Sequence, residues 1–164
     1  MQTRLSAEWV PRAVATARTS SEAAARASAV GDITLDDAVL ILLVEDEPLM
    51  LILAQDALEH GGYSVLEAPT GEEAIRILTE RSSEIAGLVT DVRLGKGANG
   101  WEVARHGREQ KPSLPVVYLT AESAEEWAAH GVPKSLLVQK PYTSAQLSTA
   151  ISTLINEASI TTIG

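Results

Sequence analysis

Short apolar runs alternate with helix-like stretches along most of the chain. The first run, AVLILLV from Ala38 to Val44, is continuous and stops at acidic residues, which is typical of a strand buried in a parallel sheet. Four later stretches are also interpreted as strands, and they cover residues 63–68, 85–90, 114–119 and 136–138. The pattern therefore predicts five strands, each of which ends close to a polar residue.

Helical patterns fill the intervals between these runs. Pro48 suits a first helical turn, and apolar residues then recur at helical spacing, at Leu49, Ile52, Leu53 and Leu58. Thr70, followed three residues later by Glu73, is a capping-box signature for the second helix. The remaining helices are expected at residues 101–110, 123–130 and from about 143 to 155.

Five strands alternating with five helices over about 120 residues predict an α/β fold. We expect a doubly wound, five-stranded parallel sheet flanked by five helices, formed by residues 36–156 and followed by a short C-terminal tail, residues 157–164. Residues 1–35 contain nine alanines and no sustained apolar stripe, so they are interpreted as a flexible N-terminal arm of unknown role.

The composition and charge of the chain argue against several classes of function. The chain carries 13 Lys and Arg against 22 Asp and Glu, a net charge of -9, which argues against direct binding of nucleic acid. It has no cysteine, so thiolate metal sites and disulfides are excluded and a cytoplasmic location fits best. No apolar run is long enough to cross a bilayer, so we expect no membrane association.

Polar residues follow four of the five predicted strands. In a doubly wound sheet the ligand site lies beyond the carboxyl ends of the strands. Any one of these residues would more often be a turn former or a cap, but their joint placement indicates a site. The set comprises Glu45, Asp46, Asp91, Thr120 and Lys140.

Four segments around these residues resemble the receiver domain of two-component response regulators: ILLVEDEP, LVTDVRL, VVYLTAES and VQKPY. The resemblance extends from about residue 38 to residue 155 and implies the flavodoxin-like receiver fold, with strand order 2-1-3-4-5. Because the chain after about Ile155 is too short for an output domain, we expect a stand-alone, single-domain receiver.

The resemblance also implies a function. Asp91 would accept a phosphoryl group from a sensor histidine kinase or a histidine phosphotransferase, forming a transient aspartyl phosphate. The chain would then signal to a downstream protein target, not identified by the sequence, through phosphorylation-dependent protein–protein interaction. It would be a phosphoacceptor that assists its own phosphorylation and dephosphorylation, not an enzyme with a separate substrate, and whether it forms a homodimer is left open.

Phosphoryl transfer depends mainly on positioning and charge neutralisation, which a hard divalent cation with oxygen ligands provides. Asp46 and Asp91 should bind this cation directly. By similarity to receivers, the backbone carbonyl of Arg93 is a third ligand and Glu45 acts through water, with Mg²⁺ (or Mn²⁺) as the cofactor. Family members often carry Asp at the position of Glu45.

Lys140 and the Thr120 hydroxyl are the groups expected to pair with the phosphoryl oxygens. Movement of Thr120 would couple phosphorylation to the surface of the domain. Many receivers have an aromatic residue where this chain has Leu137, so this part of the relay is expected to differ. Trp127 and Tyr142 are candidate substitutes, although ordinary packing is the more common role of such residues.

Two other functions stay open at this point. The chain could be a degenerate receiver that acts as a constitutive protein-interaction module, although its intact acidic, Thr and Lys set argues against this. It could also be a flavodoxin-like cofactor binder, because a fold alone does not decide function. The absence of a phosphate-binding loop after the first strand disfavours that alternative.

Overall fold

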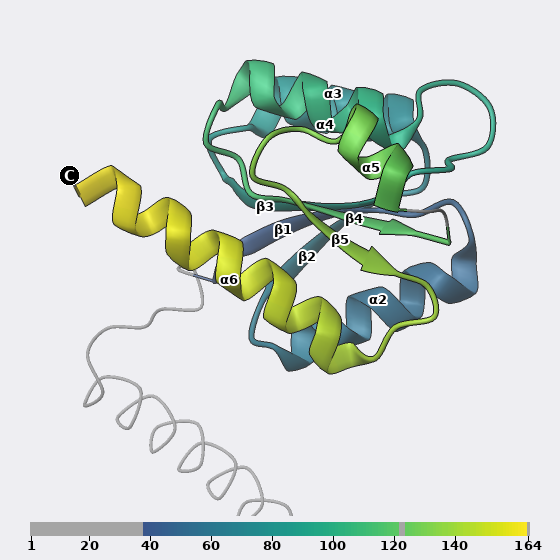
Figure 1. The fold of residues 1–164 in the computed structure, drawn as a ribbon, viewed down its shortest axis with the longest axis horizontal. Helices are drawn as coiled ribbons and strands as arrows, with labels where there is room; N and C mark the ends of the chain where they lie inside the picture. The colour runs from purple at the N-terminus through teal and green to yellow at the C-terminus, as the bar shows by residue number, and fades with distance from the viewer. Residues whose placement is uncertain (1–37, 122–123, 164) are drawn as a thin grey trace, which may run out of the picture. The chain divides into compact units, whose positions relative to one another are not determined.

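The computed structural model describes residues 38–121 and 124–163, and the predicted arm, residues 1–35, lies outside them (Figure 1). Within the described residues the strands are β1 (Leu40–Val44), β2 (Ser64–Ala68), β3 (Ile85–Asp91), β4 (Val116–Thr120) and β5 (Leu136–Gln139). The helices are α2 (Pro48–His60), α3 (Gly71–Arg81), α4 (Gly100–Gln110), α5 (Ala124–His130) and α6 (Ser144–Ile163). Strands and helices alternate, as the sequence predicts.

The five strands form one parallel sheet in the order β2-β1-β3-β4-β5. Figure 1 shows α3, α4 and α5 on one face of this sheet and α2 and α6 on the other. The predicted fold class and strand order are therefore confirmed. The strand order reverses between β1 and β3, which is where a doubly wound sheet opens a crevice at its carboxyl edge.

Each face of the sheet carries its own apolar core. Leu42 and Leu88 point into the core beneath α3, α4 and α5, whereas Ile41 and Val89 point into the core beneath α2 and α6. Successive residues of a strand face opposite sides of the sheet, so a strand that is covered on both sides must be apolar throughout. This explains why β1, which lies inside the sheet, is a continuous apolar run in the sequence.

Side-chain caps begin the two helices α3 and α4. The Thr70 hydroxyl accepts a hydrogen bond from the Glu73 amide at 3.2 Å, which confirms the predicted helix start. Asn99 and Glu102 form a complete capping box at the start of α4, each side chain accepting a hydrogen bond from the other residue's backbone amide. These caps satisfy backbone amides that have no partner within the helix.

Helix α2 buries a different face from the one its leucines and isoleucines suggest. Small residues, Ala54 and Ala57, pack against the sheet together with Leu58. Three of its larger apolar side chains lie in solvent: Leu49 is 62% exposed, Ile52 60% and Leu53 53%. Of the apolar residues that define the predicted helical spacing, Leu58 is the one that reaches the core.

Helix α6 is longer than the sequence analysis predicts. It continues to Ile163, so the predicted end at about Ile155 is wrong. Residues 156–163 contain neither Pro nor Gly, and nothing in this stretch interrupts a helix. In the part of the chain that the structure describes, no helix has the length and hydropathy needed to cross a membrane.

Candidate functional site

Strand register brings the predicted site residues to one edge of the sheet. Val44 lies beside Thr90 in the β1–β3 pair, so that Glu45 follows level with Asp91. Thr120 ends β4 and lies beside Gln139, which directly precedes Lys140. Residues from four separate segments therefore meet where the sequence analysis expects them.

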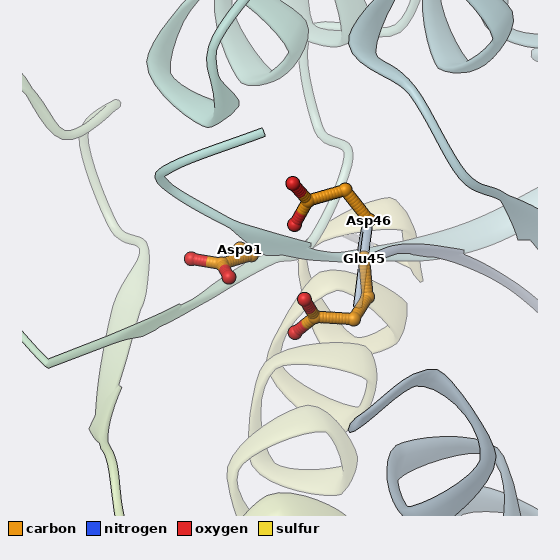
Figure 2. A group of neighbouring side chains, drawn as sticks. All are labelled: Glu45, Asp46 and Asp91. Atoms are coloured by element: carbon orange, nitrogen blue, oxygen red, sulfur yellow. The ribbon is translucent and has the colours of Figure 1, made fainter. Parts of the chain in front are cut away.

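Three carboxylates form the centre of this site. Glu45, Asp46 and Asp91 each offer an oxygen, and these oxygens lie within 4.8 Å of one another. Figure 2 shows the side chains of Glu45 and Asp46 extending from consecutive residues toward the side on which Asp91 lies. Glu45 is 1% exposed and Asp91 8%, whereas Asp46 is exposed, so the cluster opens to solvent at Asp46.

The ammonium group of Lys140 bridges the two buried carboxylates. Its Nζ lies 2.9 Å from Asp91 Oδ2 and 3.1 Å from Glu45 Oε2. Burial acts to lower the pKa of Lys140, but its hydrogen bonds to Asp91 and Glu45 outweigh burial and raise the pKa above the ordinary value. Lys140 is therefore charged throughout the physiological pH range.

Glu45 is less readily ionised in this cluster than in water. Burial raises the pKa of its carboxyl above the ordinary value, and the negative charge of Asp91 raises it further. Hydrogen bonds from Lys140 and from the Glu47 amide oppose this rise without cancelling it. A carboxylate that resists ionisation in this way gains from a nearby cation.

The donor set fits a hard divalent cation. Mg²⁺ prefers carboxylate and carbonyl oxygens, and three carboxylate oxygens converge here. The Arg93 amide donates a hydrogen bond to Asp91 Oδ1 at 3.1 Å, which places the backbone of this residue beside the cluster. Direct coordination by the Arg93 carbonyl, and the water-mediated role of Glu45, stay predictions.

Thr120 lies next to this cluster and is 2% exposed. Its backbone carbonyl accepts a hydrogen bond from the Lys140 amide at 2.8 Å. The end of β4 and Lys140 are thus directly linked through the backbone. The pairing of the Thr120 hydroxyl with a phosphoryl group stays a prediction.

Only one of the two candidate aromatic substitutes shares a core with Leu137. Leu137 and Trp127 are both partly buried against the core beneath α3, α4 and α5, and the Trp127 indole N–H donates to Ser135 Oγ at 3.0 Å. Tyr142 packs against the opposite core, and its hydroxyl is buried without a hydrogen-bond partner among the described residues. Of the two candidates, Trp127 is therefore the one on the same side of the sheet as Leu137.

One polar contact near the site was not predicted. Glu72, in the first turn of α3, accepts a hydrogen bond from the Ala98 amide in the loop that follows Asp91. The two residues are 26 positions apart, and their pairing has no local sequence signature.

The comparisons with known proteins identify the family. The family model of the response regulator receiver domain matches residues 41–152, which include all of the site residues. The chain belongs to the response regulator receiver family, whose members are phosphoacceptor signalling proteins of two-component systems. This membership disfavours the alternative of a flavodoxin-like cofactor binder.

Individual relatives agree with this assignment. A receiver protein from Sinorhizobium medicae is 42% identical, with a TM-score of 0.71, and the match covers 74% of this chain and 98% of that one. The receiver domain of sensor histidine kinase PA1611 from Pseudomonas aeruginosa, which has magnesium coordinated in its active-site cleft, is 25% identical with a TM-score of 0.64. That match covers 73% of this chain and 98% of the other.

A curated relative is longer than this chain. The response regulator SaeR from Staphylococcus aureus is 29% identical over 117 residues, which are 70% of this chain and 50% of SaeR. The matched region thus spans about half the length of that relative.

Proposed function

We propose that this protein accepts a phosphoryl group on Asp91 from a histidine kinase or a histidine phosphotransferase, in a reaction that requires Mg²⁺. The observation that carries the proposal is the pairing of buried Asp91 with Lys140 inside a three-carboxylate cluster. A buried carboxylate with a lysine held against one oxygen is oriented for attack and has a cation ready for the charge that arrives.

The charges of the cluster support a divalent cation. Three carboxylates and the Lys140 ammonium leave two negative charges, which a single Mg²⁺ neutralises. Asp46, Asp91 and the Arg93 carbonyl would hold the ion directly, and Glu45 would hold it through water. The ion would supply charge neutralisation for the incoming phosphoryl oxygens.

In the transfer, an oxygen of Asp91 attacks the phosphorus of a phosphohistidine. The new O–P bond forms as the P–N bond breaks, and the histidine leaves with the bonding electron pair and takes up a proton. Phosphorylation replaces one carboxylate charge with nearly two charges on the phosphoryl oxygens. Lys140 Nζ lies 2.9 Å from Asp91 Oδ2, which supports a role for Lys140 in pairing with one of these oxygens. The Thr120 hydroxyl would pair with another.

The exposed apolar face of α2 is our proposed docking site for the phosphodonor protein. Leu49, Ile52 and Leu53 lie on the helix that begins directly after the acidic residues 45–47. A partner that covers these side chains would remove apolar surface from water, and it would bring a phosphohistidine toward Asp91.

The output surface is proposed on β5 and its flanking helices. A groove of about 530 Å³ runs between β5 and α6, and Leu137, Val138 and Ala150 are among its lining residues. A downstream protein that binds this surface would sense changes at Lys140, which directly follows β5. Transfer from a cytoplasmic kinase domain would place the protein in the cytoplasm.

The first testable prediction concerns the phosphoacceptor itself. A small phosphodonor with Mg²⁺ should label the wild-type protein with one phosphoryl group, and Asp91→Asn should abolish the labelling because an amide forms no acyl phosphate. Intact-mass spectrometry measures the added mass. Asp56→Asn is the matched control, since this exposed aspartate on α2 pairs with His60 outside the site. Full labelling of Asp91→Asn would refute the proposal.

A further inference from the structure

The loop between β3 and α4, residues 92–99, is closed at its base beside Asp91. The Val92 amide donates to the Leu119 carbonyl at 3.2 Å, and the Gly100 amide donates to the Val92 carbonyl at 2.9 Å. A Cβ atom at Gly100 would lie 2.1 Å from the Asp91 carbonyl oxygen, so the backbone here passes closer than any side chain allows. Both ends of the loop are thus fixed against the end of β3.

The last part of the same loop, just before α4, is held by α3. The Ala98 amide donates to Glu72 Oε1 at 2.8 Å, and this bond lowers the pKa of the Glu72 carboxyl below its ordinary value. Gly97 has a φ of 93°, and a Cβ atom there would lie 1.8 Å from Glu72 Oε1. The carboxylate therefore occupies the space that any larger residue at position 97 would need.

The loop also faces the metal ligands. A Cβ atom at Gly95 would lie 3.4 Å from Asp46 Oδ2, which is ordinary van der Waals contact, and the Arg93 amide donates to Asp91 Oδ1. The loop thus bonds to Asp91 through Arg93, passes close to Asp46 at Gly95 and bonds to Glu72 through Ala98.

We propose that Glu72 is a positioning residue for the cation site. Its carboxylate clamps the loop of residues 92–99 through Ala98, and this holds the backbone of Arg93 and Gly95 against Asp91 and Asp46. The inference rests on the proposed function, in which Asp46, Asp91 and the Arg93 carbonyl bind Mg²⁺. Without the clamp the loop would sample more conformations, and Mg²⁺ binding would have to order it.

The test compares Mg²⁺ affinity in Glu72→Ala, Glu72→Gln and wild type by titration calorimetry. Outer-sphere partners of metal ligands change affinity by about 10- to 100-fold, and for a clamp one step further away we expect a loss of about three- to tenfold in Glu72→Ala. Glu72→Gln keeps an oxygen acceptor for the Ala98 amide and should stay within about twofold of wild type. Glu80→Ala is the matched control, because it removes a charge from the same helix where the carboxylate pairs with Arg76.

A second readout reports the loop directly. In metal-free Glu72→Ala the Ala98 amide should exchange with solvent faster than in wild type, and Mg²⁺ should slow it again. Gly97→Ala should weaken Mg²⁺ binding strongly when Glu72 is present, because the added Cβ atom collides with the Glu72 carboxylate and the backbone is strained at positive φ. In the Glu72→Ala background the same substitution should weaken binding less, because only the backbone strain remains.

The outcomes separate this inference from the function on which it rests. If wild type binds no Mg²⁺, the proposed cation site is wrong. If wild type binds Mg²⁺ and Glu72→Ala binds it equally well, the positioning role of Glu72 is wrong whatever happens to the exchange of Ala98. A loss in Glu80→Ala as large as that in Glu72→Ala would also overturn it, since a general charge effect would then explain both.

Discussion

The two helix layers of this receiver use their apolar side chains differently. On one face of the sheet, α3 buries Ile77 and Leu78 in a closed core. On the other face, α2 packs Ala54 and Ala57 against the sheet and leaves larger side chains in solvent. The first layer has the burial expected of a folded domain, and the second carries surplus apolar surface beside the acidic site. The difference is what the proposed docking role of α2 requires, because a docking helix must keep apolar side chains accessible.

Adjacent carboxylates repeat this contrast within the site. Glu45 and Asp46 are consecutive, yet Glu45 is buried against Lys140 whereas Asp46 is exposed. We therefore expect the buried carboxylate of Glu45 to affect mainly the stability of the fold. We expect the exposed carboxylate of Asp46 to affect mainly cation binding. Variants at buried and exposed positions test this division in the helices and in the site.

The largest effect on stability is expected at a buried leucine of α3, Leu78, which we compare with an exposed leucine of α2, Leu53. Leu78→Ala empties a fully buried site and should lower the free energy of unfolding by about 3 kcal/mol, as large-to-small core substitutions do. Leu53→Ala removes a side chain that is half in solvent and should change it by less than about 1 kcal/mol. Urea unfolding monitored by circular dichroism measures both. Equal losses would show that α2 is packed as tightly as α3.

The same exposed residues should matter for phosphotransfer. Leu53→Ala and Ile52→Ala should each slow transfer from a phosphorylated histidine protein by about three- to tenfold, because an apolar anchor that contributes about 1 kcal/mol changes the rate by about fivefold. Labelling by a small phosphodonor should be unchanged, since that reaction needs no docking surface. Single-turnover transfer assays measure the two rates.

Ile160→Ala provides the control for these transfer rates. Ile160 is 73% exposed, but it lies near the end of α6, whose start follows Lys140 and whose end is distant along the helix from the site. This variant should transfer at the wild-type rate. If it slows transfer as much as Leu53→Ala does, general surface hydrophobicity explains the effect and the docking face is misplaced.

The sequence was sufficient for the fold and for most of the site, for a physical reason. Strands buried on both faces must be apolar throughout, so their ends are visible as the first polar residues. Glu45, Asp91 and Thr120 stand at such ends, and parallel pairing then brings them to one edge. The family resemblance added their order and the role of Lys140.

The buried face of α2 and the contact of Glu72 with Ala98 could not be predicted from the sequence. Apolar periodicity could not tell which face of α2 is buried, because its small alanines, not its leucines, allow the helix to approach the sheet. The Glu72 clamp joins residues that are distant in sequence, so no local pattern indicates it. Two features could have been predicted: Asn99 with Glu102 three residues later fits a capping box, and the absence of Pro and Gly after Ile155 favours a longer α6.

The smallest effect on stability that we predict is the difference between neutralising Glu45 and neutralising Asp46 in metal-free protein. The pKa of Glu45 is raised in the folded state, first by burial and then by Asp91. Above the ordinary value of 4.5 the folded protein therefore holds a proton that the unfolded chain releases, and stability falls as pH rises through this window. Glu45→Gln removes that loss, and Lys140 keeps its partner Asp91.

With a chelator present, the melting temperature of Glu45→Gln should exceed that of wild type at pH 7, and the difference should shrink as the pH falls toward 4.5. Asp46→Asn should raise the melting temperature less, because the group that it neutralises is exposed. Adding Mg²⁺ should raise the melting temperature of wild type above that of Asp46→Asn, since wild type gains a bound ion and Asp46→Asn loses a direct ligand. Thermal melts at several pH values, with and without Mg²⁺, measure both effects. A larger metal-free gain in Asp46→Asn than in Glu45→Gln would mean that repulsion within the cluster, and not burial, limits the stability of the site.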